Sequence, residues 1–354
     1  MIHASGGTVS VTGRVIEVDV YGHARLNIQV EQFHTAGFAP GDIVTVQTGT
    51  FEGDMPFFDG YYVERGEFLV CALPGEKNIS VGINYGQFAE MAGIDIGDRA
   101  VITLKEKGGA LMQQELNHLV YTDDRKDYDS DETFGNFRAV TAGKTGRGSL
   151  YRSASPVSNE HERASVVNAL AEAAGIRTVL NMGDTFLEVL AFSVDERFDS
   201  TYYMDLYTNG QVIALGMSID YQSEEFNEKL IRGLSFLAER EPPYLIHCTE
   251  GKDRTGFAVM LLEALMGAGR AEIEEDYLLS YVNYYHLNPQ RDTEKLSMIA
   301  ERNIRDMLRW MTGWDQAALP EEMNLEKCAE KYLLGHGMKT EVLERLKKKL
   351  QRNA

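Results

Sequence analysis

The segment YLIHCTEGKDRTG, residues 244–256, gathers a thiol, two cations and a glycine in one short loop. We expect an apolar strand to end at His247, a loop to run from Cys248 to Arg254, and an apolar helix to follow. Successive backbone N–H groups of such a loop can converge on one anion, and the helix N-terminus adds partial positive charge. Gly251 lets the backbone approach the anion closely. The predicted anion-binding residues are Thr249, Glu250, Gly251, Lys252, Asp253 and Arg254.

Cys248 stands at the mouth of this loop. A free thiol has a pKa of about 8.5, and a helix N-terminus with nearby cations lowers it to about 3.5–7.5. We therefore expect a thiolate nucleophile at this position. Arg254, six residues later, can bind two phosphoryl oxygens with its planar fork, and the Thr255 hydroxyl can stabilise the thiolate as a leaving group. These side chains predict phosphoryl transfer through a cysteinyl-phosphate intermediate.

The loop resembles the Cys-x5-Arg-Ser/Thr active-site loop of the cysteine-dependent protein tyrosine phosphatase superfamily. The longer string HCxxGKDRTG, residues 247–256, is similar to the bacterial and fungal tyrosine/lipid phosphatase branch. Asn136-Phe137-Arg138 and Tyr151-Arg152-Ser153-Ala154 support it, and the resemblance covers about Gly135 to Gln351. It implies a phosphoric monoester hydrolase of protein tyrosine or dual specificity. Phosphoinositides and other polyphosphorylated molecules are a second implied substrate class.

A carboxylic acid near the loop must protonate the leaving oxygen, and three aspartates are candidates. The resemblance implies that the loop aspartate, Asp253, can do so in this branch. In most cysteine phosphatases an Asp on a separate mobile loop has this role, and Asp205 lies in a suitable region. Asp184 is the third candidate. It closes the string Asn181-Met182-Gly183-Asp184, where the branch usually has Asp-Leu-Arg.

Two more residues of the motif have expected roles. His247 precedes the nucleophile and is expected to orient the loop. For Lys252 the resemblance implies contact with an additional phosphate of a polyphosphorylated substrate. The alternative for Lys252 is a solvated cation that adds only general positive potential.

A function of another class is a phosphate-binding adaptor that keeps the loop but turns over little substrate. Retention of Cys248, Arg254 and an acid candidate favours the enzyme, because a binder needs the arginine but not the thiolate.

The elements that carry this loop belong to the second of two predicted domains. Residues 135–354 are predicted to form the phosphatase domain, an α/β sheet covered by helices with a helical tail. The expected helices span 159–174, 224–240, 255–266, 273–284, 296–310, 324–334 and 341–351, and the expected strands span 176–180 and 244–247. An acidic segment, residues 122–134, is expected to be a solvated linker.

Residues 1–121 show a period of two with Gly, Asp and Pro clusters, which predicts a small all-β barrel or sandwich with one short helix at 86–92. Tyr61-Tyr62-Val63 is among the expected strands. This part weakly resembles the C-terminal β-domain of S-adenosylmethionine hydrolase and halogenase proteins, where a Phe-Gly-Asn stretch helps hold adenosine. Here the stretch is Tyr21-Gly22-His23, which favours a structural or substrate-shaping role.

Composition limits the remaining possibilities. The formal charge of −19 argues against nucleic-acid binding and against tight binding to anionic membranes. We expect no cofactor and no metal, because the Asp127, Asp129 and Asp131 spacing lacks the glycine and the final glutamate of a calcium loop. Three cysteines and a first segment without signal-peptide features predict a cytoplasmic protein, or a secreted one if a signal peptide has been removed. The expected partner is a phosphorylated protein, small molecule or lipid headgroup.

Overall fold

The computed structural model describes residues 2–5, 8–195, 198–314, 320 and 323–353. The chain divides into two compact units, Met1–Leu119 and Val120–Ala354, which are described one at a time. No helix in the described ranges combines the length and the apolar character that crossing a membrane requires.

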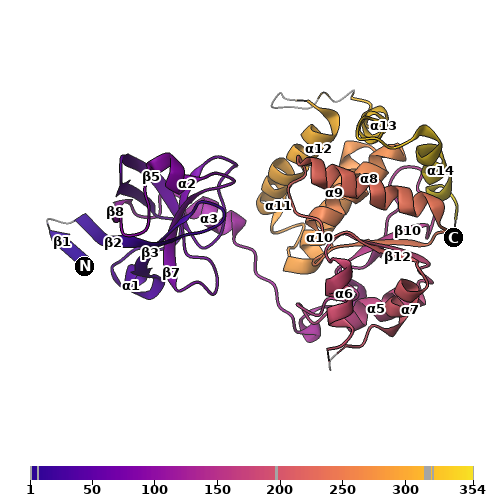
Figure 1. Cartoon of the computed structure of the whole chain (residues 1–354), viewed down its shortest axis with the longest axis horizontal. Helices are drawn as coiled ribbons and strands as arrows, with labels where there is room; N and C mark the ends of the chain where they lie inside the picture. The colour runs from indigo at the N-terminus through magenta and orange to yellow at the C-terminus, as the bar shows by residue number, and fades with distance from the viewer. Residues whose placement is uncertain (1, 6–7, 196–197, 315–319, 321–322, 354) are drawn as a thin grey trace. The chain divides into compact units, whose positions relative to one another are not determined.

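The first unit contains a closed barrel (Figure 1). Seven strands follow one another around it in the order β2-β3-β7-β6-β5-β4-β8, and β8 pairs back with β2. The strands are β1 Ile2–Ser5, which extends β2, then β2 Thr8–Val18, β3 Ala24–Gln29, β4 Ile43–Thr48, β5 Phe51–Phe58, β6 Phe68–Cys71, β7 Asn78–Ile83 and β8 Arg99–Glu106. Alternate residues fill the interior, as Val44 and Val46 do on β4. The all-β prediction is confirmed as a barrel.

Three short helices accompany the barrel: α1 Val30–Thr35, α2 Phe88–Ala92 and α3 Leu111–Asn117. The expected helix at 86–92 corresponds to α2. The expected strand at Tyr61–Val63 is wrong, because these residues form no ladder. Val63 instead buries its side chain beside Phe58 and Leu69, so the apolar pattern reflects packing of a loop.

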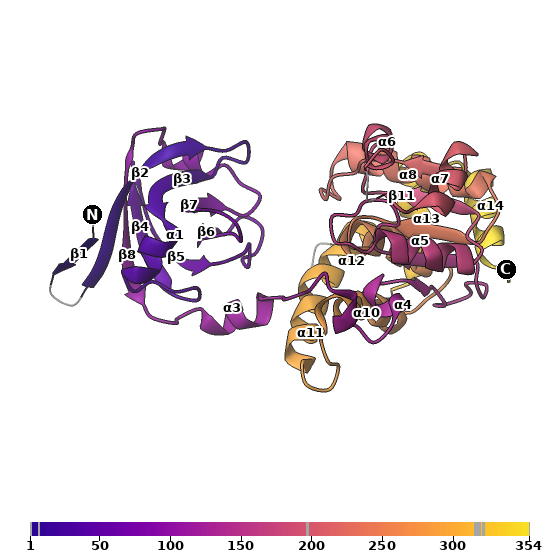
Figure 2. The same ribbon diagram turned by 90° about the horizontal axis from the view of Figure 1, so that it is seen from below.

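The acidic segment expected to be a linker, residues 122–134, lies within the second unit. It contains a 3-10 turn, η1 Arg125–Asp127, and the short helix α4 Asp131–Phe134. Tyr128 and Phe134 are buried, and the Tyr128 hydroxyl donates to the carbonyl of Tyr284 over 3.2 Å. Figure 2 shows α4 beside α10, the helix that carries Tyr284. The prediction of a solvated linker relied on the acidic residues and did not take into account that Tyr128 and Phe134 would be buried.

The second unit is built on a sheet in the order β12-β11-β13-β10-β9. Its strands are β9 Arg138–Ala139, β10 Leu150–Ser153, β11 Thr178–Asn181, β12 Val212–Ala214 and β13 Tyr244–His247. The four strands from β12 to β10 are parallel, and β9 is antiparallel at one edge. Every residue of β13 and β11 is buried, as expected for central strands covered on both faces.

Helices cover both faces of this sheet (Figure 1). One face carries α5 Ala164–Ala173, α6 Phe186–Phe192 and α7 Thr201–Thr208. The other carries α8 Glu224–Glu239, α9 Asp253–Leu265 and α10 Arg270–Tyr285. The tail continues as α11 Thr293–Ile299, a π-helical turn η2 Ala300–Ile304, α12 Arg305–Thr312, α13 Leu325–Gly335 and α14 Thr340–Leu350. The α/β prediction with a helical tail is thus confirmed, whereas α6, α7 and β12 were not expected.

Candidate active site

The expected strand, loop and helix are present as β13, residues 248–252 and α9. Ser153 of β10 and Asn181 of β11 lie in register with His247, so three parallel strands end together where the loop begins. Ligands of open α/β sheets bind at this carboxyl edge, where helix N-termini also point. The motif of the sequence therefore occupies the edge at which a site is expected.

Gly251 is at a position that only glycine can occupy. Its φ of +71° lies in the left-handed region, and a Cβ built on it would stand 2.1 Å from the carbonyl oxygen of Ser153. This close approach presses the loop against the end of β10. The glycine of the motif thus serves the approach of two backbone segments, as well as the expected approach to an anion.

The loop carbonyls are bound from outside the loop. The backbone N–H of Ser155 donates to the Thr249 carbonyl over 3.0 Å. The Asn136 amide donates to the Glu250 carbonyl over 3.1 Å, and Arg152 Nη2 donates to the Gly251 carbonyl over 2.9 Å. Within the described part of the chain, no acceptor receives the backbone N–H groups of residues 249–252. A loop whose carbonyls are held in this way can offer its N–H groups to an anion.

A buried charged cluster fixes Arg152 in turn. Asp276 of α10 accepts hydrogen bonds from both Arg152 and Arg138 through separate carboxylate oxygens. Burial opposes ionisation of Asp276, but the two guanidinium groups outweigh it and hold its pKa below the usual range. Nearby, burial raises the pKa of Glu263 well above its ordinary value, and the negative charge of Asp276 raises it further, against the opposing effect of the two arginines. The cluster places two arginines behind the loop.

The proposed nucleophile, Cys248, is buried with 3% of its surface exposed. Thr255, expected to stabilise its thiolate, is fully buried, and its hydroxyl makes no hydrogen bond among the described residues. His247 is also fully buried, and neither ring nitrogen has a hydrogen-bond partner there. Burial lowers the pKa of His247 to about 3. The imidazole is therefore neutral and lies beside the Tyr203 ring, and its expected role of orienting the loop stays a prediction.

Arg254 lies at the mouth of the site. Its Nη2 donates to the Thr249 hydroxyl over 3.1 Å, and its Nη1 donates to the Met217 carbonyl over 3.0 Å. These contacts leave the guanidinium at the loop opening, half-buried, rather than neutralised by a carboxylate. Arg254 is therefore placed to bind an anion in the loop.

Lys252 is buried and contacts neighbouring groups of the protein. Its ammonium pairs with the Glu250 carboxylate over 2.8 Å, donates to the Tyr285 hydroxyl over 2.7 Å and stands over the Tyr285 ring. Burial favours the neutral amine, but the negative charges of Asp253 and Glu250 outweigh it and raise its pKa. The alternative expectation of a solvated lysine is wrong, because only 9% of the surface of Lys252 is exposed.

Two of the three acid candidates adjoin the loop. Asp253 is the first residue of α9; its carboxylate accepts from the Tyr277 hydroxyl over 3.3 Å and lies 3.6 Å from the Lys252 ammonium. Asp184 is buried and accepts from the Asn181 amide over 3.0 Å. Burial raises the pKa of Asp184. Gly183, its neighbour, packs against the loop so closely that a Cβ there would lie 3.3 Å from the Thr249 nitrogen.

The third candidate, Asp205, lies on α7, and its side chain is exposed. Tyr203, two residues earlier on the same helix, is buried against His247 and receives a hydrogen bond from Asn181. Positions two apart on an α-helix point about 200° away from each other. The structure therefore brings Tyr203 toward the site and turns Asp205 away from it.

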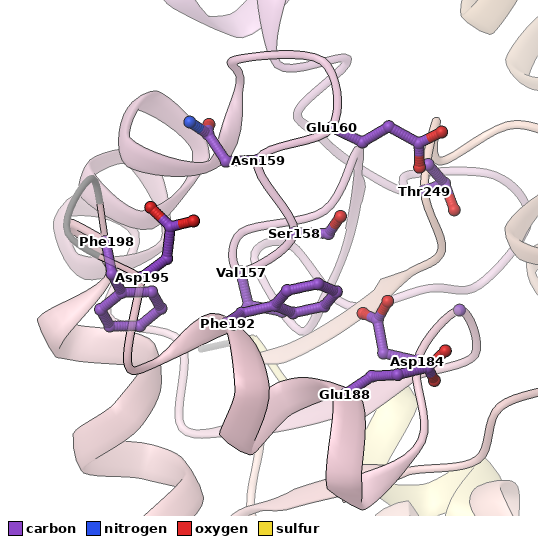
Figure 3. A pocket seen from close by; sticks show the side chains of 11 residues that line it. Val157, Ser158, Asn159, Glu160, Asp184, Glu188, Phe192, Asp195, Phe198 and Thr249 are labelled. Atoms are coloured by element: carbon purple, nitrogen blue, oxygen red, sulfur yellow. The ribbon is translucent and has the colours of Figure 1, made fainter.

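A pocket of about 420 Å³ opens beside the loop. Figure 3 shows the Phe192 ring along its middle, with the carboxylates of Asp184 and Glu188 on one side and that of Asp195 on the other. The lining residues are Val157, Ser158, Asn159, Glu160, Gly183, Asp184, Glu188, Phe192, Asp195, Phe198 and Thr249. Thr249 and Asp184 thus connect the anion-binding loop to a wall that the sequence reasoning missed. Only the capping pattern Thr185-x-x-Glu188 marked α6 locally.

In the described ranges, no three His, Cys, Asp or Glu side chains gather in a way that could hold a metal ion.

Comparison with known proteins assigns part of this unit. Residues 194–352, which include the loop, match the model of the tyrosine phosphatase family. No curated protein matches the chain. Among solved structures, the chain is similar to the crystal structure of an uncharacterized conserved protein from Thermotoga maritima, with 23% identity and a TM-score of 0.25. That similarity covers 29% of this chain and 38% of the other. The second unit therefore contains a segment that is similar to the tyrosine phosphatase family, and this supports a phosphatase activity in general terms.

Proposed function

We propose that the protein hydrolyses phosphate monoesters through a cysteinyl-phosphate intermediate on Cys248. The observation that carries this proposal is the anchoring of the loop. The carbonyls of Thr249, Glu250 and Gly251 are bound from outside, so the N–H groups above Cys248 are available to phosphoryl oxygens. Preorganised donors of this kind stabilise the charge of a transferring phosphoryl group without rearranging during the reaction.

In the first step the Cys248 sulfur attacks phosphorus, an S–P bond forms and the ester P–O bond breaks. The departing oxygen takes a proton from a carboxylic acid and leaves as the alcohol or phenol. In the second step water attacks phosphorus, gives its proton to the same carboxylate and displaces the thiolate, which releases inorganic phosphate. Arg254 binds two equatorial oxygens in both steps, and its planar fork fits them.

Asp253 and Asp184 compete for the role of proton donor. Asp253 follows the loop as the first residue of α9, and its carboxylate lies 3.6 Å from the Lys252 ammonium. Asp184 lines the pocket, and its raised pKa suits a group that must hold a proton. The test compares the pH profile of kcat for an aryl phosphate in Asp253→Asn and Asp184→Asn. The variant that loses the fall in kcat at alkaline pH identifies the acid. The other variant keeps a bell-shaped profile.

Between the two implied substrate classes, the surroundings of Lys252 favour phosphotyrosine. A second phosphate would have to compete with Glu250 and Tyr285 for a buried ammonium. We therefore propose phosphotyrosine in proteins as the substrate, in preference to phosphoinositides.

For the barrel we propose a structural or substrate-shaping role rather than adenosyl chemistry. His23 replaces the asparagine of the resembling family, and it is buried. Its ring nitrogens contact the Tyr61 hydroxyl at 3.0 Å and the Ile83 carbonyl at 3.3 Å. A side chain engaged in this way supports the barrel.

The deciding experiment compares turnover of p-nitrophenyl phosphate by the full chain, Cys248→Ser and Cys328→Ser. Cys328→Ser is the matched control, because it removes another free cysteine of the same unit, on α13. We expect only Cys248→Ser to abolish turnover. If the unaltered chain binds phosphate but turns over no substrate, the adaptor function replaces this proposal.

A further inference from the structure

The pocket beside the loop carries an inference about substrate choice, which rests on the proposed function. The pocket adjoins the loop, because Thr249 belongs to both, so a group attached next to the phosphorylated side chain can reach it. Four of its lining residues are acidic: Glu160, Asp184, Glu188 and Asp195. Among the lining residues that the structure describes, none is Lys, Arg or His.

The charges of this wall are fixed by local contacts. Glu188 accepts hydrogen bonds from the Thr185 backbone and hydroxyl, both at 2.7 Å, which lower its pKa and keep it ionised. Glu160 is exposed and makes no ion pair or hydrogen bond within the described ranges. After burial, the negative charges of Glu188 and Glu160 both contribute to the raised pKa of Asp184. Glu188 and Glu160 therefore give this wall a negative potential even when Asp184 holds a proton.

The pocket also has an apolar wall. Phe192 and Phe198 line it, and both are half-buried, so part of each ring is available to a ligand. Figure 3 shows Phe192 between the carboxylates of Asp184 and Asp195. Aromatic rings beside carboxylates favour an alkyl chain that ends in a cation, because the chain packs on the ring and the charge meets the acids.

We propose that this pocket binds a Lys or Arg side chain next to the phosphotyrosine of a protein substrate. The loop binds the phosphate and the acidic wall binds the neighbouring cation, so the negative and positive groups of the substrate occupy different parts of the site. An acidic neighbour meets like charge and desolvation, as does the second phosphate of a phosphoinositide. The enzyme thus selects basic phosphotyrosine sequences and discriminates against acidic ones.

The test uses three phosphotyrosine peptides that differ only in the flanking residues, which are Lys, Gln or Glu. We expect kcat/KM of the full chain to be highest for the Lys peptide and lowest for the Glu peptide, with a ratio between Lys and Gln of about fivefold, the size expected of one or two half-exposed ion pairs. The ratio should fall at high salt, because exposed ion pairs are screened. The same order is expected for binding of the peptides to Cys248→Ser.

The variant is Glu160→Gln, because Glu188 also caps α6 and its loss would disturb the helix. Glu160→Gln should lower the Lys-to-Gln ratio, whereas Glu162→Gln, which removes the same charge at an exposed position outside the pocket, should keep it. Equal kcat/KM for the three peptides overturns the inference and leaves the proposed function standing. Absence of turnover with the same order of binding to Cys248→Ser overturns the proposed function alone, and absence of both overturns the two together.

Discussion

Arg152 Nη2 donates a hydrogen bond to the carbonyl oxygen of Gly251 over 2.9 Å, and the same nitrogen lies 3.3 Å from the carbonyl of Lys252. One buried guanidinium on β10 thus binds two successive carbonyls of the loop. Because each peptide unit is planar, a carbonyl that points toward Arg152 turns the N–H of the next residue the opposite way. The arginine that holds the loop carbonyls is therefore on a neighbouring strand, whereas Arg254, which contacts Thr249 and Met217, is the arginine that we propose for the ligand.

Asp276→Asn should weaken this arrangement without touching the ligand. Two buried guanidinium groups would lose their shared countercharge, which costs about 3 kcal/mol of unfolding free energy. We expect kcat to fall at least tenfold and inorganic phosphate to become a weaker inhibitor, because the loop N–H groups lose their fixed direction. Urea unfolding and inhibition by phosphate measure the two effects. Unchanged inhibition by phosphate in a folded variant would show that Asp276 does not position the loop.

Gly251→Ala tests the close approach of the loop to β10. The added Cβ meets the Ser153 carbonyl, so we expect turnover to fall more than a hundredfold, with a loss of about 2 kcal/mol in stability. Gly210→Ala is the matched control. Gly210 has a similar φ of +69°, but nothing lies within 4 Å of a Cβ built there. It should share the backbone strain of about 1 kcal/mol and keep its activity.

Lys252→Met separates a loop-holding role from a substrate contact. The ammonium pairs with Glu250 and Tyr285, so its loss should lower kcat/KM by the same factor on a phosphotyrosine peptide and on a short-chain phosphoinositide. Tyr285→Phe, which removes one partner hydroxyl, should give a smaller loss of the same kind. A selective loss on the phosphoinositide would restore the second-phosphate role.

Arg254→Lys should leave the fold intact and remove most of the turnover. Lysine keeps the charge, but it cannot donate to two equatorial oxygens in one plane. Circular dichroism and the kcat for p-nitrophenyl phosphate check the two parts. Turnover at the rate of the unaltered chain would contradict the two-point contact.

Acid should destabilise the second unit through His247. Its pKa of about 3 in the folded protein lies below the ordinary value of 6.5, so the unfolded chain binds more protons between these values. Stability is therefore lost as the pH falls through this window, by about 2 kcal/mol between pH 6.5 and 5. His247→Gln should remove that part of the slope in urea unfolding, whereas His336→Gln, at an exposed position, should keep it.

The strand, the loop and the helix around Cys248 could be predicted because all three are adjacent in sequence, and each has a local signal. Gly251 was predictable as a glycine but not in its packing against Ser153, which depends on the pairing of β10 with β13. Asp276 had no local signal at all. It sits on α10 among ordinary helix residues, and only the folded chain brings it to Arg138 and Arg152.

The roles of charged side chains were harder to predict from the sequence than the strands and helices. The sequence shows Lys252 beside a phosphate loop, but the aromatic and acidic groups that bind it come partly from α10. Asp205 was a second candidate because of its position along the chain, but on α7 the Tyr203 side chain is buried and the Asp205 side chain is exposed. The sequence did not predict α6, which contributes Glu188 and Phe192 to the pocket, so this side of the pocket was not predicted.

The two side chains that bind the loop carbonyls, Asn136 and Arg152, also bear on which fragment of this chain could keep the proposed activity. Asn136 and Arg152 lie before residue 194, where the family match begins, and Asn136 lies two residues after the end of α4. A fragment cut at residue 194 would keep Cys248 and Arg254 but lose both side chains that bind the loop carbonyls. The carbonyls of Glu250 and Gly251 would then lose their hydrogen-bond donors, and the loop that carries the thiol would lose its fixed conformation. A fragment made to test the proposed activity should therefore begin upstream of Asn136, well before the stretch that matches the family.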